Sequence, residues 1–167
     1  FRIAHAMEYG GAENLNPFDP NRFTPTIYFL YSRLVRANPD DEPAPDLALR
    51  WSSNASATIW RFDLRKGVTF HDGSTFDAGD VAYSLTYLLD PEIDSPLIST
   101  LGIISRIEVI DPHTVDIHLK SAHADFPVLL MDYRARIIPE GIGEAIRYKG
   151  TGTGPFMISK LDPEGIT

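Results

Sequence analysis

Residues 58–91 constrain the fold of this chain more than any other stretch, because they predict a strand, a tight turn and a helix in immediate succession. Apolar and charged residues alternate near the start, which is the period of a strand with one buried face. The apolar residues of this alternation are Trp60, Phe62 and Leu64. Lys66-Gly67 then predicts a turn, and residues 68–70 predict a short strand that returns beside the first.

A capped helix is predicted directly after these strands. The D-G pair at residues 72–73 is a strong signal for a tight turn, because both residue types tolerate positive φ. Asp77 is the expected N-cap, and Asp80 completes an acidic form of the capping box. The apolar residues that follow have helical spacing: Val81, Leu85, Leu88 and Leu89. Pro91 predicts the end of the helix.

The flanking elements predict a mixed α/β (α+β) fold. Residues 106–120 alternate outward and back around a D-P-H-T turn, and so predict a hairpin. Apolar spacing predicts a helix over residues 24–35, and residues 2–7 predict a first strand. Residues 37–45, rich in proline and acidic side chains, predict a solvated loop, and residues 156–161 predict a late strand.

Composition limits the classes of partner and of chemistry. The chain has 167 residues, enough for one domain, and a net charge of −8, which argues against nucleic acid and anionic membranes as partners. It contains no cysteine, which excludes disulfides and thiolate chemistry. No apolar run approaches the roughly 20 residues that span a bilayer, and the sequence shows no signal peptide. If the protein is exported, we expect Phe1 to follow a cleavage site or a fragment boundary.

The sequence shows no pattern typical of catalysis. None of the five histidines has the spacing that places two imidazoles on one face of a helix or strand, and no serine lies in a G-x-S-x-G motif. We therefore expect no catalytic residue, no metal and no cofactor. One alternative stays open, a metal-assisted hydrolase that uses His118, Asp116 and His123, although His118 and Asp116 share the polar face of the predicted hairpin.

The glycine-rich run at residues 150–154 does not predict a phosphate-binding loop. Such a loop requires a lysine and a hydroxyl residue at the start of a following helix. Pro155 and an extended apolar segment follow here instead. We interpret the run as a structural connection.

Two arginines are the strongest candidates for ligand recognition. Arg134 and Arg136 lie two apart in a segment predicted as a strand, where both guanidinium groups share one face. Such a pair suits a carboxylate, and the alternative is a surface strand with two solvated arginines. Three aromatic side chains are candidates for the walls of a small-ligand site, or else for the core: Tyr9, Phe23 and Tyr133.

The central motifs resemble those of a known family. The run W-R-F-D-L-R-K-G-V-T-F-H-D-G-S-T-F-D-A-G-D-V, which begins at Trp60, resembles the signature of the family 5 extracellular solute-binding proteins. These proteins are the peptide-, nickel- and opine-binding components of bacterial ABC importers. Three further segments are similar to the same family: L-N-P at residues 15–17, P-x-L-A-x-x-W at residues 45–51 and G-T-G-P-F at residues 152–156.

The resemblance implies a periplasmic-binding-protein type II-like fold, with this chain as the N-terminal part of lobe I and its extra subdomain. It implies a division into residues 1–43 as the first part of lobe I, residues 44–155 as the extra subdomain, and residues 156–167 as a truncated return strand. The C-terminal lobe of the same protein is expected outside this sequence. Half of the ligand cleft would then be missing, so we expect no measurable solute binding by the chain alone.

The function implied by the resemblance is that of a solute-binding component of an ABC importer, not an enzyme. Such a protein holds a small peptide, an opine or a metal chelate between two lobes and delivers it to a permease in the inner membrane. The implied location is periplasmic or extracellular. A sensor or a chaperone on the same fold is an alternative.

The resemblance also nominates ligand contacts. Residues shortly after the L-N-P turn are nominated as cleft residues: Pro20, Asn21, Arg22 and Phe23. The loop after the central helix nominates Leu97 and Thr100. The nickel-binding branch has an arginine before a corresponding I-x-P strand, which nominates Arg134 or Arg136 and favours an anionic ligand.

Overall fold

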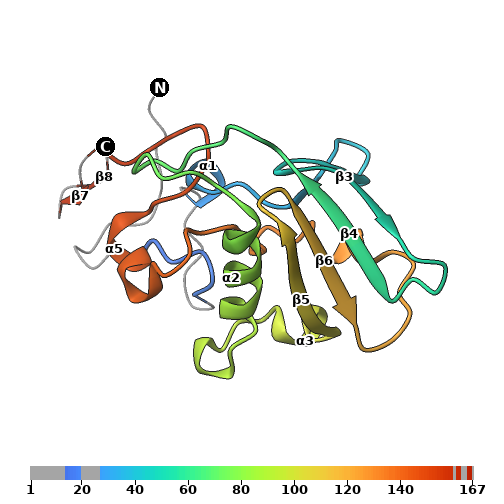
Figure 1. Cartoon of the computed structure of the whole chain (residues 1–167). Helices are drawn as coiled ribbons and strands as arrows, with labels where there is room; N and C mark the ends of the chain where they lie inside the picture. Colours follow the sequence, from blue (N-terminus) through green and yellow to red (C-terminus); the bar gives the residue numbers. More distant parts are fainter. Residues whose placement is uncertain (1–13, 20–26, 160, 163–164, 167) are drawn as a thin grey trace.

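A four-stranded antiparallel sheet and the helix α2 beside it form the centre of the molecule (Figure 1). The computed structural model describes residues 14–19, 27–159, 161–162 and 165–166. The helices are α1 (Ile27–Leu30), α2 (Ala78–Leu88), α3 (Ile98–Leu101), α4 (Phe126–Leu129), α5 (Ile146–Lys149) and the 3-10 turns η1 (Pro91–Ile93) and η2 (Gly143–Ala145). The strands are β1 (Val35–Ala37), β2 (Pro43–Pro45), β3 (Ala48–Ser53), β4 (Ile59–Leu64), β5 (Ile104–Asp111), β6 (Thr114–Leu119), β7 (Leu161–Asp162) and β8 (Gly165–Ile166).

The sheet follows from the alternation of apolar and charged residues. Its strand order is β3-β4-β6-β5, with every neighbouring pair antiparallel. Trp60 and Phe62 of β4 lie opposite Ile117 and Val115 of β6, and all four side chains are buried. Because side chains alternate across a strand, the charged neighbours of these residues face outward. The strand and the hairpin predicted from this pattern are confirmed.

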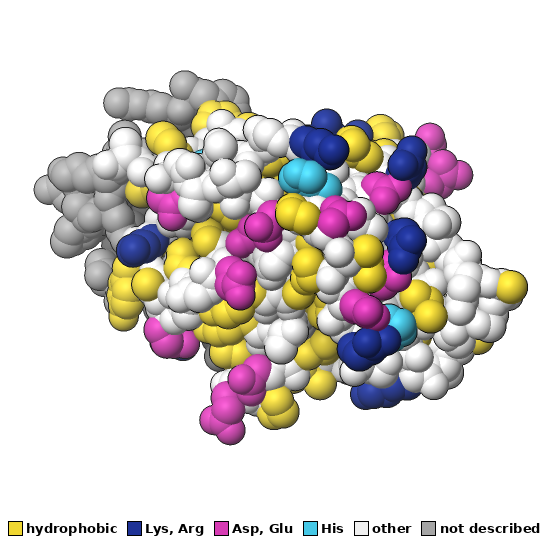
Figure 2. Space-filling view, viewed as in Figure 1, with side chains coloured by type: hydrophobic (Ala, Val, Ile, Leu, Met, Phe, Trp, Pro, Cys, Tyr) yellow, Lys and Arg dark blue, Asp and Glu magenta, His cyan; other side chains and the backbone are white. Residues whose placement is uncertain are grey.

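Ion pairs line the outer face of the sheet. Three of them lie across or along the strands: Arg50–Asp63, Arg61–Asp116 and Arg106–Glu108. Figure 2 shows basic and acidic side chains interspersed over the side of the molecule that the sheet occupies. This mixture of signs is typical of a solvated face.

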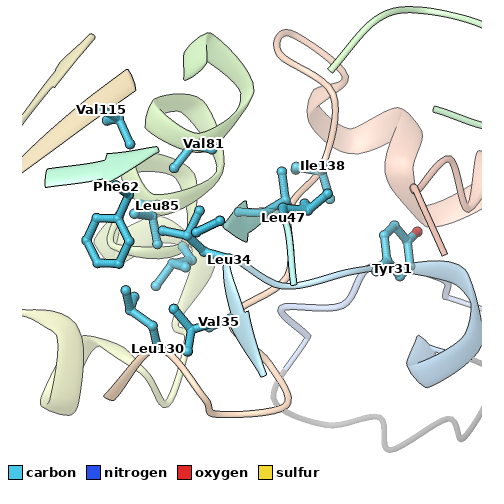
Figure 3. Packing of buried hydrophobic residues seen from close by; sticks show 14 of the residues in the cluster. Tyr31, Leu34, Val35, Leu47, Phe62, Val81, Leu85, Val115, Leu130 and Ile138 are labelled. Atoms are coloured by element: carbon cyan, nitrogen blue, oxygen red, sulfur yellow. The ribbon is translucent and has the colours of Figure 1, made fainter. Parts of the chain in front are cut away.

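Helix α2 begins at the predicted N-cap. The Asp77 carboxylate accepts a hydrogen bond from the backbone N–H of Gly79 at 2.7 Å, and the Asp80 carboxylate accepts one from the backbone N–H of Asp77 at 2.8 Å. This is the predicted capping box. Val81 and Leu85 then point from α2 toward the sheet (Figure 3), as the apolar spacing predicts.

One buried apolar cluster joins the sheet, α2 and the segments around them. In Figure 3, Leu34 lies between Phe62 and Leu47, and Val35 lies beside Leu130. All of them belong to this cluster. The cluster therefore includes residues on both sides of the predicted boundary at residues 43/44. The division of the chain at that boundary stays a prediction.

The short return strand predicted for residues 68–70 is wrong. Both edges of β4 are occupied, by β3 and by β6, so no edge is free for a third strand. Residues 68–76 instead close on themselves, with a single bridge between Thr69 and Thr75. Gly73 has φ +88° at the tip of this turn, as the D-G pair predicts.

The helix predicted for residues 24–35 is mostly wrong. Only α1 is helical among the described residues of that stretch, and β1 begins within it. The backbone carbonyls that would continue the helix accept hydrogen bonds from distant segments instead. Leu30 O accepts from Gly154 N at 2.9 Å, and Ser32 O accepts from Ile137 N at 3.1 Å. Tertiary partners thus replace the i to i+4 bonds of a helix.

Two other predicted segments differ from the structure. Residues 37–45 are not simply a loop, because β1 and β2 pair as a small antiparallel hairpin around an exposed turn at residues 38–42. Residues 156–158 are not a strand, and the last described residues form the short hairpin β7–β8 instead. The strand predicted for residues 2–7 lies outside the described residues. None of the described helices is long and apolar enough to cross a bilayer.

Candidate solute-binding wall

Three segments that are distant in sequence meet beside α1, and they bring together several buried polar atoms that have no hydrogen-bond partner among the described residues. Arg33 and Arg136 form an isolated antiparallel bridge. The Ser32 hydroxyl donates to the backbone oxygen of Thr153 at 3.3 Å. Residues 31–33, 136–137 and 152–154 therefore form one contiguous, mostly buried cluster, which we call the arginine wall.

Arg136 is the most unusual side chain of this wall. It is only 3% exposed, and it donates from Nη1 to Tyr31 O and from Nε to Tyr133 O. Its third nitrogen, Nη2, is buried and has no hydrogen-bond partner among the described residues. Burial and the nearby charge of Arg33 lower the pKa of Arg136 to about 10, so the group is still a cation at neutral pH. A buried cation with an unmet N–H is costly unless an anion meets it.

Arg33 adds a second guanidinium to the same face. Residues opposite each other in an antiparallel bridge project to the same side, so the side chains of Arg33 and Arg136 are neighbours. Arg33 Nη1 donates to Met131 O at 2.6 Å, whereas the buried Nε has no partner within the described ranges. Burial lowers the pKa of Arg33. The buried hydroxyl of Thr153 likewise has no described partner.

Aromatic rings cover part of the wall. The rings of Tyr28 and Tyr133 are stacked, with centroids 5.6 Å apart and an interplanar angle of 25°. The guanidinium carbon of Arg136 lies 5.1 Å from the centroid of Tyr28. Tyr28 is partly exposed, so its ring can contact a ligand and Arg136 at once. The ring of Tyr133 is also partly exposed, but the guanidinium carbon 5.1 Å from its centroid is that of Arg134.

Arg134 differs from Arg136, contrary to the prediction that both share a strand face. Arg134 lies in a turn, where its backbone N–H donates to the Asp132 carboxylate at 2.9 Å. Its guanidinium forms a bidentate pair with the same carboxylate, at 2.9 and 2.7 Å. Burial opposes ionisation of Asp132, but the hydrogen bonds from Arg134 outweigh it and lower the pKa of Asp132. The guanidinium of Arg134 is therefore already paired with the Asp132 carboxylate.

The other nominated ligand contacts do not join this wall. Leu97 is fully buried in the apolar core, so it does not line an open surface. Thr100 is exposed on α3, beside β5 (Figure 1). The remaining nominated residues lie outside the described part of the chain: Tyr9, Pro20, Asn21, Arg22 and Phe23.

The histidine cluster of the hydrolase alternative is not assembled. Both carboxylate oxygens of Asp116 accept hydrogen bonds from Arg61 at 2.7 Å, which lowers the pKa of Asp116. His118 Nε2 lies 3.1 Å from Glu108. Within the described ranges, no group of three or more His, Asp or Glu side chains has the geometry to hold a metal ion.

Sequence reasoning missed Arg33, Tyr28 and Thr153 as members of the wall. Arg33 and Tyr28 lie in a stretch that was predicted as a helix. A helix prediction does not indicate which distant residues these side chains contact. Thr153 fell within a glycine-rich connection that was interpreted as purely structural. The G-T-G-P-F motif itself was the available signal, because glycines permit the close backbone approach that brings Thr153 to Ser32.

Comparison with known proteins identifies relatives over most of the chain. Residues 42–167 match the family described as bacterial extracellular solute-binding proteins, family 5 Middle. Di/tripeptide-binding protein 2 of Pseudomonas aeruginosa is 32% identical over 86% of this chain and 33% of its own length. The HTH-type transcriptional regulator SgrR of Salmonella typhi is 33% identical over 98% of this chain and 29% of its own length.

A solved structure agrees with these sequence relatives. The PBP/SBP MoaA from A. tumefacien R10, in complex with mannopinic acid, superposes with a TM-score of 0.81 and 28% identity, over 93% of this chain and 34% of that one. The mixed α/β architecture predicted from the sequence is thus the fold of these binding proteins. The chain spans about a third of the length of the proteins it matches.

Proposed function

Because the chain belongs to the bacterial extracellular solute-binding proteins of family 5, we propose that it forms the first-lobe part of a solute-binding component of an ABC importer. The complete protein holds a small peptide, an opine or a metal chelate in a cleft between two lobes. It then delivers this solute to a permease of the inner membrane. Its location is extracytoplasmic, in the periplasm or outside the cell.

The observation that supports a site in this part of the protein is the unmatched guanidinium of Arg136. The N–H groups of Arg136 Nη2 and Arg33 Nε have no described partner, although both atoms are buried. A carboxylate of the solute would accept from these groups and compensate the buried charge. Tyr28 and Tyr133 would then form an apolar wall beside it.

The relatives favour the same chemistry. Di- and tripeptides end in a carboxylate, and mannopinic acid, the solute of the MoaA structure, is an acid by name. We therefore propose a solute with at least one carboxylate, which the arginine wall binds. The residues nominated outside the described ranges and in the second lobe supply the rest of the cleft.

A second candidate is the solute-sensing part of a transcriptional regulator. The match to SgrR, at 33% identity over 98% of the chain, favours it. Both candidates bind a solute with this lobe and differ in what the rest of the protein does. A helix-turn-helix region in the complete protein would support the regulator, and an export signal would support the importer.

The test is solute binding by the complete protein. Native mass spectrometry of protein purified from its host is expected to reveal a co-purifying small solute with a carboxylate. For the Arg136→Gln variant, we expect affinity for a di- or tripeptide to fall by about 10- to 100-fold, the effect of one hydrogen bond to a charged group. A peptide with an amidated C-terminus is expected to bind the native and variant proteins equally.

Arg134→Gln is the matched control, because Arg134 is already paired with Asp132. It is expected to leave affinity nearly unchanged. Circular dichroism and thermal unfolding check that each variant folds. An equal loss of affinity for free and amidated peptides in Arg136→Gln would contradict the carboxylate assignment, and no bound solute under any condition would contradict the binding function.

A further inference from the structure

His71 connects the tight turn before α2 to the segment at residues 152–154 by three hydrogen bonds. The backbone N–H of His71 donates to Gly152 O at 2.9 Å. The backbone N–H of Gly152 donates to His71 Nδ1 at 3.3 Å. On the other side of the ring, His71 Nε2 lies 2.9 Å from Gly154 O. Both imidazole nitrogens therefore contact the backbone of one short segment.

These contacts require one protonation state of the imidazole. Gly152 N–H is a donor, so Nδ1 must be the acceptor and carry no proton. Gly154 O is an acceptor, so Nε2 must carry the proton. Only the neutral imidazole protonated on Nε2 satisfies both contacts. A second proton, on Nδ1, would face the Gly152 N–H and break that hydrogen bond.

The segment that His71 holds also lies tightly against the α1 region. Gly154 N donates to Leu30 O at 2.9 Å, and a Cβ on Gly152 would lie 2.0 Å from the same oxygen. Between these glycines is Thr153, whose backbone oxygen accepts from Ser32. The position of Thr153 in the arginine wall is thus fixed by contacts with residues 30–32 and by the imidazole.

Asp72, the next residue of the turn, is exposed, and hydrogen bonds from Ser74 lower its pKa. Lys149 of α5 lies close enough to Asp72 to lower that pKa further. Tyr31, beside Gly152, is buried, which raises the pKa of its hydroxyl and keeps it neutral. Residues 152–154 are Gly, Thr and Gly, and none of them has a titratable side chain.

We propose that His71 is a positioning residue of the solute site, which holds residues 152–154 in place only while its imidazole is neutral. This inference rests on the proposed solute-binding function. Protonation of His71 releases Gly152, loosens Thr153 from the arginine wall and weakens solute binding. Acidification of the medium therefore weakens the affinity for the solute.

The first test is independent of any solute. Nitrogen-15 NMR of the imidazoles in the unliganded complete protein at pH 8 is expected to show His71 protonated on Nε2 and bare on Nδ1. Hydrogen exchange of the Gly154 amide is expected to speed up about tenfold between pH 8 and pH 5.5, after correction for intrinsic exchange, because one bond of the segment is lost. A bare Nε2, or protection of Gly154 that does not change with pH, would overturn the proposal.

Two variants, His71→Asn and His113→Asn, distinguish a role of His71 in positioning residues 152–154 from a general effect on the stability of the protein. His71→Asn keeps an acceptor near the place of Nδ1 but does not titrate, so its Gly154 protection is expected to be independent of pH. His113→Asn is the control, because the buried Nδ1 of His113 has no described partner, and it is expected to keep the native pH profile. If His71→Asn instead follows the native profile, His71 is not the titrating group and the proposal fails. If His71→Asn does not fold, the imidazole NMR and the Gly154 hydrogen exchange of the native protein still test whether the neutral imidazole holds residues 152–154.

The second test measures affinity for a tripeptide with the same proteins. Native affinity is expected to fall about tenfold from pH 8 to pH 5.5, and the affinity of His71→Asn is expected to stay level. A native affinity that stays level while Gly154 loosens would overturn the link to the solute site. If no variant binds the tripeptide at any pH, the proposed solute class fails, while the solute-free experiment still decides the role of His71.

Discussion

The Ser84 hydroxyl bonds to both backbone polar groups of Ile138. Its oxygen accepts from Ile138 N at 2.8 Å and donates to Ile138 O at 3.1 Å, and Ser84 is fully buried. Ser84 belongs to α2, whereas Ile138 follows Arg136 by two residues. The helix that begins at the capping box therefore fixes the segment that holds the arginine of the proposed site.

Replacing Ser84 by alanine is expected to destabilise the protein. Two buried backbone groups of Ile138 would lose their partner, which costs about 1–3 kcal/mol of unfolding free energy. Denaturant unfolding measures this loss. Ser105→Ala is the control, because Ser105 also donates one hydrogen bond, to His118 O, but is exposed. A loss in Ser84→Ala no greater than in Ser105→Ala would contradict this role.

Glycine is required where residues 152–154 approach α1. A Cβ on Gly152 would lie 2.0 Å from the backbone oxygen of Leu30. Because this oxygen belongs to the backbone, the clash can be relieved only by moving the main chain. Gly152→Ala is expected to cost about 1–3 kcal/mol or more. In Gly79→Ala, the nearest atoms at 2.9 Å are side-chain oxygens of Asp77 and Glu140 and not backbone atoms, so a smaller effect, limited to disturbance of the Asp77 cap, is expected. Thermal unfolding of the two variants compares them, and equal losses would argue against the close approach.

Leu97 is expected to affect stability rather than ligand binding. The side chain is fully buried, so Leu97→Ala leaves a cavity and costs about 2–5 kcal/mol. Thr100→Ala, one helical turn further and exposed, is expected to change stability by less than about 0.5 kcal/mol. Chemical denaturation of both variants is the measurement. A stable Leu97→Ala protein with weakened solute binding would restore Leu97 as a ligand contact.

The pair of Arg61 and Asp116 is expected to make stability depend on pH in the acid range. The hydrogen bonds from Arg61 lower the pKa of Asp116 in the folded protein, so ionised Asp116 stabilises the fold above the ordinary aspartate pKa. That contribution is lost as the pH falls through the lowered value. Arg61→Gln is therefore expected to differ most from the native protein near neutral pH and to converge with it in strong acid.

Acid unfolding followed by circular dichroism measures this difference. Arg50→Gln is the control, because it removes an ion pair whose two side chains are more exposed than Arg61 and Asp116, and a smaller loss of stability is expected because solvent screens the charges. A constant offset between Arg61→Gln and the native protein at all pH values would contradict the role of Asp116.

The elements that were predicted correctly have local causes. The alternation around Phe62 defines β4 whatever strands lie beside it, and the capping box of Asp77 and Asp80 begins α2 within a few residues of chain. Val115 and Ile117 likewise define β6 by alternation alone. In these segments, the hydrogen bonds and the burial pattern agree with the local sequence.

The elements that were predicted wrongly are determined by hydrogen bonds to residues that are distant in the sequence. The apolar residues of the stretch 27–34 have helical spacing, but the carbonyls of Leu30 and Ser32 accept hydrogen bonds from Gly154 and Ile137, and nothing near them in sequence specifies those partners. The bridge between Arg33 and Arg136 has the same origin. Arg134 was wrongly predicted to lie in a strand. It lies in a turn that is held by the hydrogen bond from its backbone N–H to the Asp132 carboxylate, and the spacing of the residues does not reveal that bond. Arg136 could be nominated from the sequence, but its grouping with Arg33 and Thr153 could not be predicted from spacing.

The Ser32–Thr153 contact, between residues 121 positions apart, has a consequence for the order of folding. The carbonyls of residues 29–32 have their partners at residues 136–156, so these hydrogen bonds form only after that segment has been synthesised. The hairpin β5–β6 closes over a short loop, whereas this contact must first overcome the entropy of a very long one. The arginine wall is therefore expected to become ordered after the hairpin β5–β6.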